Sequence, residues 1–227
     1  MSHHPTNELL KSYANGSIDA AHGLMVSAHI EHCAHCRNVV EQFEAVNART
    51  AFESNSQPIG EQSIAVTDFD RMFDNIVCLE TISPSAMMKR PPKYVEVNGK
   101  RFELPSSLGN LLDRMGEWRS YGGKVFSAHL DLDEEARVNF MYINRDVHIP
   151  QHTHKGIEST LVLHGGFSDE DGHYDTGAFI QRDASVKHSP YTKASEDCLC
   201  LTVLTEPMLF TQGVARVFNL FGKGLYP

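Results

Sequence analysis

The sequence lacks any long apolar run and any visible leader segment. No apolar stretch reaches the roughly 20 residues that a membrane-spanning helix needs, so we expect no association with a membrane. Residues 1–5 hold neither a basic nor an apolar segment, and no secretory signal is expected. A cytoplasmic protein keeps its thiols reduced, so the five cysteines are expected to be ligands, redox groups or buried small residues and not a disulfide framework.

Basic residues are scarce in the first third of the chain. Residues 1–82 contain four basic side chains against eleven acidic ones, a net charge of −7, whereas residues 83–227 carry a net charge of −2. Such an acidic segment is poorly suited to bind phosphates, so we expect no direct DNA binding. It is suited to dock on a basic protein, including one that normally binds nucleic acid, although charge taken alone favours a simple solvated surface.

The rest of the composition is that of folded domains. With 227 residues, of which 41% are hydrophobic, the chain can build two domains with apolar cores. The spacing of apolar residues within residues 1–82 predicts four helices. They are expected around Leu9, with Thr6 as N-cap and an end at Asn15-Gly16; after Ser17 as N-cap; from about Ala34 to Phe52; and from Thr67 or Asp68 onward.

The fourth of these helices carries a wide apolar stripe and follows a polar loop at residues 53–60. The stripe consists of Phe69, Met72, Phe73, Ile76, Val77 and Leu79. It either packs on the first three helices, which the sequence alone favours, or forms a surface that completes a binding partner.

From residue 93 onward the pattern changes to short strands. Asn98-Gly99 lies between two alternating segments and predicts a hairpin. Further strands are expected at 124–130, 136–143, 159–163, 177–181 and 199–204, with Gly122-Gly123, Gly165-Gly166 and Asp171-Gly172 between them. Many short strands with such turns are typical of an antiparallel barrel or jelly roll.

The chain is therefore expected to contain more than one domain. A helical domain at residues 1–82 should precede an all-β domain at residues 93–227. The segment 83–92 is the predicted linker, because its prolines stop both helices and central strands.

Metal-ligand residues are concentrated first in the segment 29–36. Cys33 and Cys36 are three residues apart, a spacing at which two thiolates can wrap one metal ion. When the segment is projected onto a helix, His29 shares a face with both cysteines, whereas the other two histidines of the segment do not. His29 is therefore expected as the third ligand.

A fourth ligand must come from outside this segment. His4 and His3 are the candidates, and His22 is a weaker one. Four protein ligands leave no open position, so the predicted role is that of a structural zinc site. The alternatives are two buried cysteines with exposed histidines, or a redox dithiol, which the absence of a βαβ pattern disfavours.

A second concentration of ligand residues lies in the β region. His152 and His154 are two residues apart and face the same side of a strand. Glu158 can join them across a bend at Gly156, and His188 can complete the set from a later strand. Three imidazoles and one carboxylate suit zinc or another divalent transition metal. The competing interpretation is a histidine-bearing surface turn.

Other ligand-type residues are expected to play no part in these sites. His129, His148, His164 and His173 are interpreted as surface or packing residues, with His148 as the nearest competitor for a ligand role. Cys198 and Cys200 are interpreted as small core residues, the alternative being a redox-responsive dithiol near the β-domain metal.

The order of these motifs resembles a known family. His29, Cys33 and Cys36 with an N-terminal histidine are similar to the zinc-binding anti-sigma domain, and His152, His154, Glu158, Gly165 and His188 are similar to the two metal-binding motifs of cupins. Together, over nearly the whole chain, they resemble the ChrR-type anti-sigma factors, which carry a C-terminal cupin domain. In that family the second histidine of an N-terminal pair is the ligand, which implies His4.

The resemblance implies a regulator and not an enzyme. The zinc domain would bind an extracytoplasmic-function (ECF) sigma factor and block its contacts with RNA polymerase. The cupin domain would sense a stress signal of the singlet-oxygen or peroxide class and favour release. The alternative is a metal-dependent cupin enzyme, a dioxygenase or isomerase, with a structural zinc module.

The chain departs from the general cupin motifs at two places. Asp146 stands where the first motif begins with glycine, and residues 183–188 lack the Pro-x-Gly that usually precedes the histidine of the second motif. Both departures concern the geometry of loops, because His188 itself is present.

Overall fold

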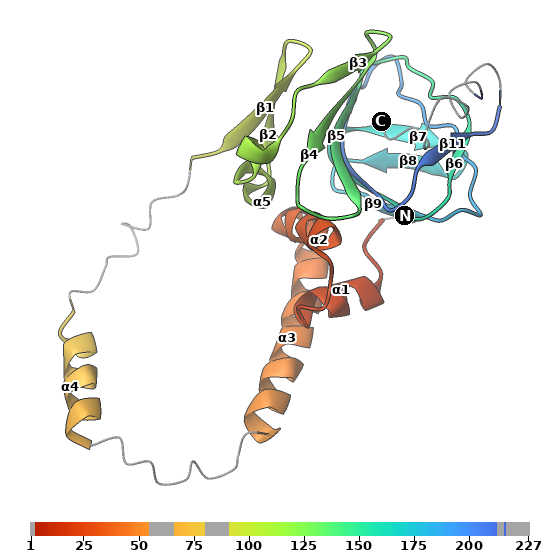
Figure 1. The fold of residues 1–227 in the computed structure, drawn as a ribbon. Coiled ribbons are helices and arrows are strands. Elements are labelled where there is room, and N and C mark those ends of the chain that lie inside the picture. The colour runs from red at the N-terminus through yellow and green to blue at the C-terminus, as the bar shows by residue number, and fades with distance from the viewer. Residues whose placement is uncertain (1–2, 55–65, 80–90, 213–215, 217–227) are drawn as a thin grey trace. The chain divides into compact units, whose positions relative to one another are not determined.

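A computed structural model describes residues 3–54, 66–79, 91–212 and 216 (Figure 1). Helices come first and strands follow, as the sequence predicts. The helices are α1 (Asn7–Ala14), α2 (Ala20–His32), α3 (Ala34–Ser54), α4 (Val66–Val77) and α5 (Ser106–Gly109), with a 3-10 turn η2 (Leu112–Arg114). The strands are β1 (Lys93–Val97), β2 (Lys100–Leu104), β3 (Arg119–Tyr121), β4 (Val125–Leu130), β5 (Arg137–Ile143), β6 (His152–His154), β7 (Glu158–Asp169), β8 (Gly172–Asp175), β9 (Phe179–Arg182), β10 (Cys198–Leu204) and β11 (Met208–Phe210).

The chain forms two compact units. One unit combines residues 1–44 with residues 92–227, and the other is residues 45–91. The division at 1–82, 83–92 and 93–227 stays a prediction about which parts fold independently, and most of the expected linker lies outside the described residues.

The first two helices begin at polar caps. Thr6 accepts a hydrogen bond from the Leu9 N–H at 3.2 Å, as predicted, and Gly16 continues the chain beyond α1 with φ +67°. The predicted cap at Ser17 is wrong, because Asp19 caps α2 by accepting from the His22 N–H at 2.9 Å. The Ser17 hydroxyl instead donates to the Ser12 carbonyl at 3.3 Å.

A break between α2 and α3 falls on Cys33. Its backbone is extended, with φ −106° and ψ 96°, so His29, Cys33 and Cys36 do not lie on one continuous helix as the projection assumed. The Cys33 N–H still donates to the His29 carbonyl, and the Cys33 sulfur accepts from the Cys36 N–H at 3.5 Å. Cys33 therefore ends one helix and caps the next.

The β domain is built on an antiparallel seven-stranded sheet with the order β3-β4-β5-β10-β7-β8, and β9 also pairs with β7. β6 and β11 form a second, two-stranded sheet, and β1 and β2 form the predicted hairpin. The hairpin turns at Asn98 and Gly99 with φ 50° and 71°, as a type I′ turn requires. All five further predicted strands are present, as β4, β5, β7, β9 and β10.

Gly165-Gly166 does not make the turn that the sequence predicts. Both residues lie inside β7, which runs on to Asp169, and the pairing of β7 with β10 shifts register just before them, between His164 and Val162. Gly165 has φ +63°, and a Cβ atom there would collide with the Asp197 carbonyl oxygen. The glycine is needed for an irregularity inside the strand and for the close approach of the chain before β10.

Helix α2 packs against the β domain within the first compact unit (Figure 1). Its buried residues Ala21, Met25 and Ala28 share one apolar cluster with residues of the sheet and of α5. Glu31 accepts hydrogen bonds from the backbone N–H groups of Ser106 and Ser107 at 2.7 and 2.8 Å. The residues around the first ligand cluster are thus held by the β domain.

The apolar side chains of helix α4 are exposed. Phe69, Met72, Phe73 and Ile76 are each more than half exposed within their compact unit. The sequence alone favoured packing of this stripe. Among the residues that the structure describes, no helix has both the length and the apolar composition needed to span a membrane.

We predict that Gly165→Ala destabilises the full chain far more than Gly122→Ala. Both glycines have positive φ values, +63° and +62°, so either alanine costs about 1 kcal/mol of backbone strain. Only at Gly165 does a Cβ collide with backbone, which adds roughly 1–3 kcal/mol of overpacking. Urea unfolding of the two variants measures the difference, and equal losses of stability would contradict this account of β7.

Candidate metal centres

The first cluster consists of His4, His29, Cys33 and Cys36, whose ligand atoms all lie within 4.8 Å of one another. The Nδ1 atom of His4 is 3.5 Å from the Cys33 sulfur and 3.3 Å from the Cys36 sulfur. The cluster therefore joins the N-terminal segment to the α2–α3 junction. Two imidazoles and two thiols have the composition of closed, four-ligand metal sites.

His29 is oriented for ligation by the β domain. Its Nδ1 atom lies 3.0 Å from the Gly177 carbonyl oxygen, to which it can donate a proton. Its Nε2 atom is buried and has no hydrogen-bond partner among the described residues. Burial lowers the pKa of His29 to about 4, so the ring is neutral at physiological pH and offers a lone pair. A metal ion would satisfy this buried atom.

The two thiols also need a cation to ionise together. Burial, together with the hydrogen bond and charge of the neighbouring Cys33, raises the pKa of Cys36 to about 12. Two adjacent thiolates are favoured only when a bound cation offsets their repulsion. The residues of the first cluster therefore suit a bound metal ion.

The other N-terminal histidines do not belong to the first cluster. The Nδ1 atom of His22 contacts Asp19 at 2.9 Å, and its Nε2 atom contacts the Ser159 hydroxyl at 3.1 Å, so both nitrogens have partners. His3 packs its ring edge-on against Tyr174, with centroids 4.7 Å apart. His32 and His35 are exposed. Of the candidates for the fourth ligand, the structure brings only His4 to the described cluster.

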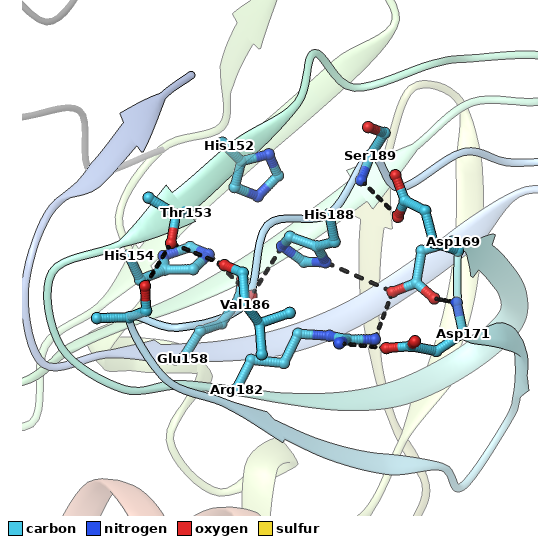
Figure 2. Close-up of polar contacts among 12 residues, drawn as sticks. His152, Thr153, His154, Glu158, Asp169, Asp171, Arg182, Val186, His188 and Ser189 are labelled. Atoms are coloured by element: carbon cyan, nitrogen blue, oxygen red, sulfur yellow. Dashed lines mark hydrogen bonds and ion pairs between the residues drawn. The ribbon is translucent and has the colours of Figure 1, made fainter. Parts of the chain in front are cut away.

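The second cluster consists of His152, His154, Glu158 and His188, which meet within the β domain (Figure 2). The histidines of β6 are both buried, and a bridge pairs His152 with His188. The Glu158 carboxylate begins β7 and lies 3.0 Å from His154 Nε2 and 3.5 Å from His188 Nε2. The surface-turn interpretation is wrong because all three imidazoles are buried.

The ring nitrogens of this cluster are arranged as those of metal ligands are. His152 Nδ1 lies 2.9 Å from the Pro150 carbonyl oxygen, so Nε2 is the nitrogen that remains to bind a metal. Burial lowers the pKa of His152 to about 4, so its ring is neutral. Both nitrogens of His154 and of His188 are buried and make no well-formed hydrogen bond within the described part of the chain.

The carboxylate of Glu158 is ionised in this setting. Burial alone raises its pKa, but the hydrogen-bonding contact with His154 and the electrostatic effect of the neighbouring imidazoles together outweigh burial and lower the pKa to about 2. Neutral imidazoles and one carboxylate are the protonation states in which these groups bind metals. The second cluster thus fits a divalent ion as well.

A cavity of about 440 Å³ lies against the second cluster. Its lining includes all four cluster residues, and most of the remaining lining is apolar. The apolar side chains include Val125, Met141, Ile143, Val147, Phe167, Met208 and Phe210. Cys200 also lines the cavity, whereas Cys198 packs in the apolar core beside it, so both thiols are buried as predicted.

The two departures from the cupin motifs leave the ligands in place. Asp146 has φ +55°, the left-handed conformation that glycine supplies most readily and that Asp tolerates. The loop before His188 turns through a hydrogen bond from the Val186 N–H to the Asp183 carbonyl at 3.2 Å, and Asp183 also accepts from the Ser185 N–H. Residues other than the usual glycine and proline therefore form both turns.

A buried ionic group behind His188 was missed in the sequence. Asp169 Oδ2 lies 3.5 Å from His188 Nδ1 and 2.5 Å from Arg182 Nη2 (Figure 2). Burial raises the pKa of Asp169, but its contacts with His188, the Asp171 N–H and Arg182 lower it to about 2. A carboxylate behind a ligand imidazole fixes its orientation. No local spacing links Asp169 to residue 188, so only the fold reveals this pair.

The remaining histidines lie outside both clusters. His148 is exposed and stacks on Tyr191, and His129 Nδ1 contacts the Val138 carbonyl at 2.9 Å. His164 packs on Phe102. His173 lies 3.0 Å from Asp175 and 3.4 Å from Glu196, a half-exposed ion-pair group near the surface that sequence spacing did not indicate.

Comparison with known proteins supports this description. Residues 116–207 match the family described as the ChrR cupin-like domain. The anti-sigma-E factor ChrR of Cereibacter sphaeroides is 28% identical over 221 residues, which cover 96% of this chain and 97% of that protein. This chain is thus similar to ChrR over nearly its whole length. The resemblance seen in the motifs is thereby confirmed.

A solved structure shows the same relationship in three dimensions. In the crystal structure of Rhodobacter sphaeroides SigE in complex with the anti-sigma ChrR, the matching chain is 27% identical, with a TM-score of 0.63. The match covers 89% of this chain and 98% of that chain. The predicted fold class, N-terminal helices with a His/Cys cluster followed by a cupin-like β domain, is confirmed.

We predict that the full chain binds two equivalents of metal. His29→Gln should remove one equivalent and His152→Gln the other, because each takes a buried donor from one cluster. His35→Gln and His148→Gln are matched controls at exposed histidines and should keep both equivalents. Metal analysis after dialysis against zinc measures the stoichiometry. A control variant that loses an equivalent would contradict this assignment of ligands.

Proposed function

We propose that the protein is an anti-sigma factor that binds and inhibits an ECF sigma factor and releases it in response to stress. The observation that carries this proposal is the similarity to ChrR over almost the full length of both proteins. In the solved complex ChrR is bound to the sigma factor SigE. One four-residue ligand cluster lies at the N-terminal helices of this chain and another lies in its β domain. This arrangement supports a division into an inhibitory helical part and a sensing β part.

The first cluster is proposed to hold zinc through His4, His29, Cys33 and Cys36. Zinc prefers such mixed thiolate and imidazole sets, and four protein ligands leave no position for a substrate. The ion would fasten the N-terminal segment to the α2–α3 junction. Its role would be to stabilise the helical part in the conformation that recognises the sigma factor.

The apolar face of α4 is proposed as part of the sigma-binding surface. Phe69, Met72, Phe73 and Ile76 form an exposed stripe on a short helix, which is the pattern of a helix that completes a partner's groove. The net charge of −7 on residues 1–82 favours approach to a basic, DNA-binding protein. Apolar burial would supply affinity, and charge would supply the rate of encounter.

The second cluster is proposed to be the sensing site, with zinc or another divalent transition metal held by His152, His154, Glu158 and His188. By resemblance, the signal is of the singlet-oxygen or peroxide class. The adjoining cavity of about 440 Å³ gives a small reactive molecule room to reach the ligands. Damage to a ligand, or its displacement, would then alter the β domain that supports α2.

The same cavity is the one observation that favours an enzyme. A metal beside a largely apolar cavity could support dioxygenase or isomerase chemistry. We favour the regulator, because the similarity to ChrR extends through the helical part as well as the β domain. Oxygen consumption by the iron-loaded full chain, at turnover rates and with release of product, would support the enzyme instead.

We predict that the full chain blocks transcription directed by a cognate ECF sigma factor with core RNA polymerase. Cys33→Ser combined with Cys36→Ser should weaken this inhibition at least about tenfold, since the helical part loses its metal. Cys78→Ser is the matched control, because that thiol is exposed and outside the cluster. In vitro transcription with increasing amounts of each variant gives the comparison. Undiminished inhibition by the double variant would rule out a structural role for the first cluster.

A separate prediction concerns α4. Phe73→Ala should weaken binding to the sigma factor by more than about tenfold, the loss expected for an apolar contact of roughly 2 kcal/mol. Asn75→Ala is the control, because a side chain two positions away lies on the opposite side of the same helix. Calorimetric titration of the full-length variants measures both affinities. Similar affinities for the two variants would show that this face does not dock.

A further inference from the structure

The segment between Tyr174 and Phe179 contacts the first metal cluster and is joined to the second through Asp169. It comprises the end of β8, the turn that follows and the start of β9. The backbone of Phe179 donates a hydrogen bond to the His3 carbonyl at 3.0 Å, directly before His4 of the first cluster. The Gly177 carbonyl faces Nδ1 of His29 at 3.0 Å. Two ligands of the first cluster are therefore held by residues of the β domain.

The ring of Tyr174 supports the same N-terminal segment. It is almost fully buried, and the His3 ring stands edge-on against it with centroids 4.7 Å apart. Edge-to-face contacts of this kind fix the relative position of two rings. The ligand His4 is thus positioned through its neighbour, both by a backbone hydrogen bond and by ring packing.

The hydroxyl of Tyr174 points toward the second cluster. It donates to Asp169 Oδ1 at 3.0 Å and accepts from Arg182 Nη2 at 2.7 Å. Asp169 Oδ2 in turn lies 3.5 Å from Nδ1 of His188, a ligand of the second cluster (Figure 2). Arg182 also stands opposite Glu158, another of its ligands, in the pairing of β9 with β7. Every member of this chain of contacts is buried or, like His3 and Glu158, partly buried.

We infer that Asp169, Arg182, Tyr174 and His3 form a mechanical link that couples metal binding at the two clusters. This inference rests on the proposed function, for which it supplies the route from sensing site to inhibitory site. An occupied second cluster fixes His188, and His188 with Arg182 fixes Asp169. Asp169 then fixes Tyr174, against which the His3 ring of the N-terminal segment is packed, next to His4. Order imposed at one cluster lowers the entropic cost of closing the other.

The direction of the coupling follows from this arrangement. When the second cluster loses its metal, His188 and Asp169 gain freedom, and Tyr174 holds the N-terminal segment less firmly. The affinity of the first cluster for metal then falls. In the proposed regulator, a signal that disrupts the second cluster would loosen the helical part that binds the sigma factor. By reciprocity, metal at the first cluster strengthens binding at the second.

A thermodynamic cycle on the full chain tests the link without any sigma factor. Cobalt(II) is the probe, because its charge-transfer absorption with Cys33 and Cys36 reports occupancy of the first cluster alone. Glu158→Gln disables the second cluster and should weaken cobalt binding at the first by about fivefold or more, the lower end of usual coupling energies. In a Tyr174→Phe background, which keeps the ring against His3 but removes the hydroxyl, the same substitution should change that affinity less than twofold.

Two further backgrounds keep the result interpretable. His3→Ala breaks the link at its far end without touching a buried polar network, so it should abolish the coupling even if Tyr174→Phe impairs folding. Tyr94→Phe is the matched control on β1 and should retain the full fivefold effect. The link is disproved if Glu158→Gln weakens the first cluster equally in all four backgrounds, or leaves it unchanged in the wild-type chain.

Failure of the link is distinguishable from failure of the proposed function. Uncoupled metal binding in a chain that still inhibits transcription would refute only the link. Coupled metal binding in a chain that does not bind a sigma factor would refute only the proposed function.

Discussion

The structure depends on the packing of α2 against the β domain. Ala21, Met25 and Ala28 are buried in the same apolar cluster as the sheet residues, whereas Val26 on the same helix packs in a smaller cluster with residues of α1 and α3. Its polar residues reinforce the contact, because His22 reaches Ser159 and Glu31 accepts the first N–H groups of α5. The metal-ligand residues at the end of α2 therefore sit at the edge of the β domain and not in a freely separate module.

Buried imidazole nitrogens give both clusters their chemistry. A ring whose Nδ1 is held by a carbonyl, as in His29 and His152, presents Nε2 in one direction and as a neutral donor. Leaving such a nitrogen buried without a partner costs free energy that a bound cation would recover. An imidazole held in this way by a backbone carbonyl occurs at both sites. The two sites differ in composition, since one has thiols and the other a carboxylate, and this suits them to different roles.

The residues behind the ligands relate the two sites to each other. Asp169 and Tyr174 belong to neither cluster, yet they stand between His188 and His3: a hydrogen bond joins them, Asp169 lies in ion-pair distance of His188, and Tyr174 packs on the His3 ring. Buried polar groups of this kind resist small displacements, because each lost hydrogen bond leaves a desolvated partner. A regulator that must pass a change from a β domain to a helical surface needs a rigid connection of this sort.

The sequence by itself indicated most of the candidate ligands and the order of the two parts. The Cys33-x-x-Cys36 spacing and the His152-x-His154 alternation are local, and local periodicity is set by the geometry of helices and strands. Only the tertiary structure decided that His4 and not His3 joins the first cluster, and that Asp169 lies behind His188. It also placed Gly165-Gly166 inside a strand and broke the helix at Cys33. These outcomes depend on contacts between residues far apart in the chain, which no local spacing encodes.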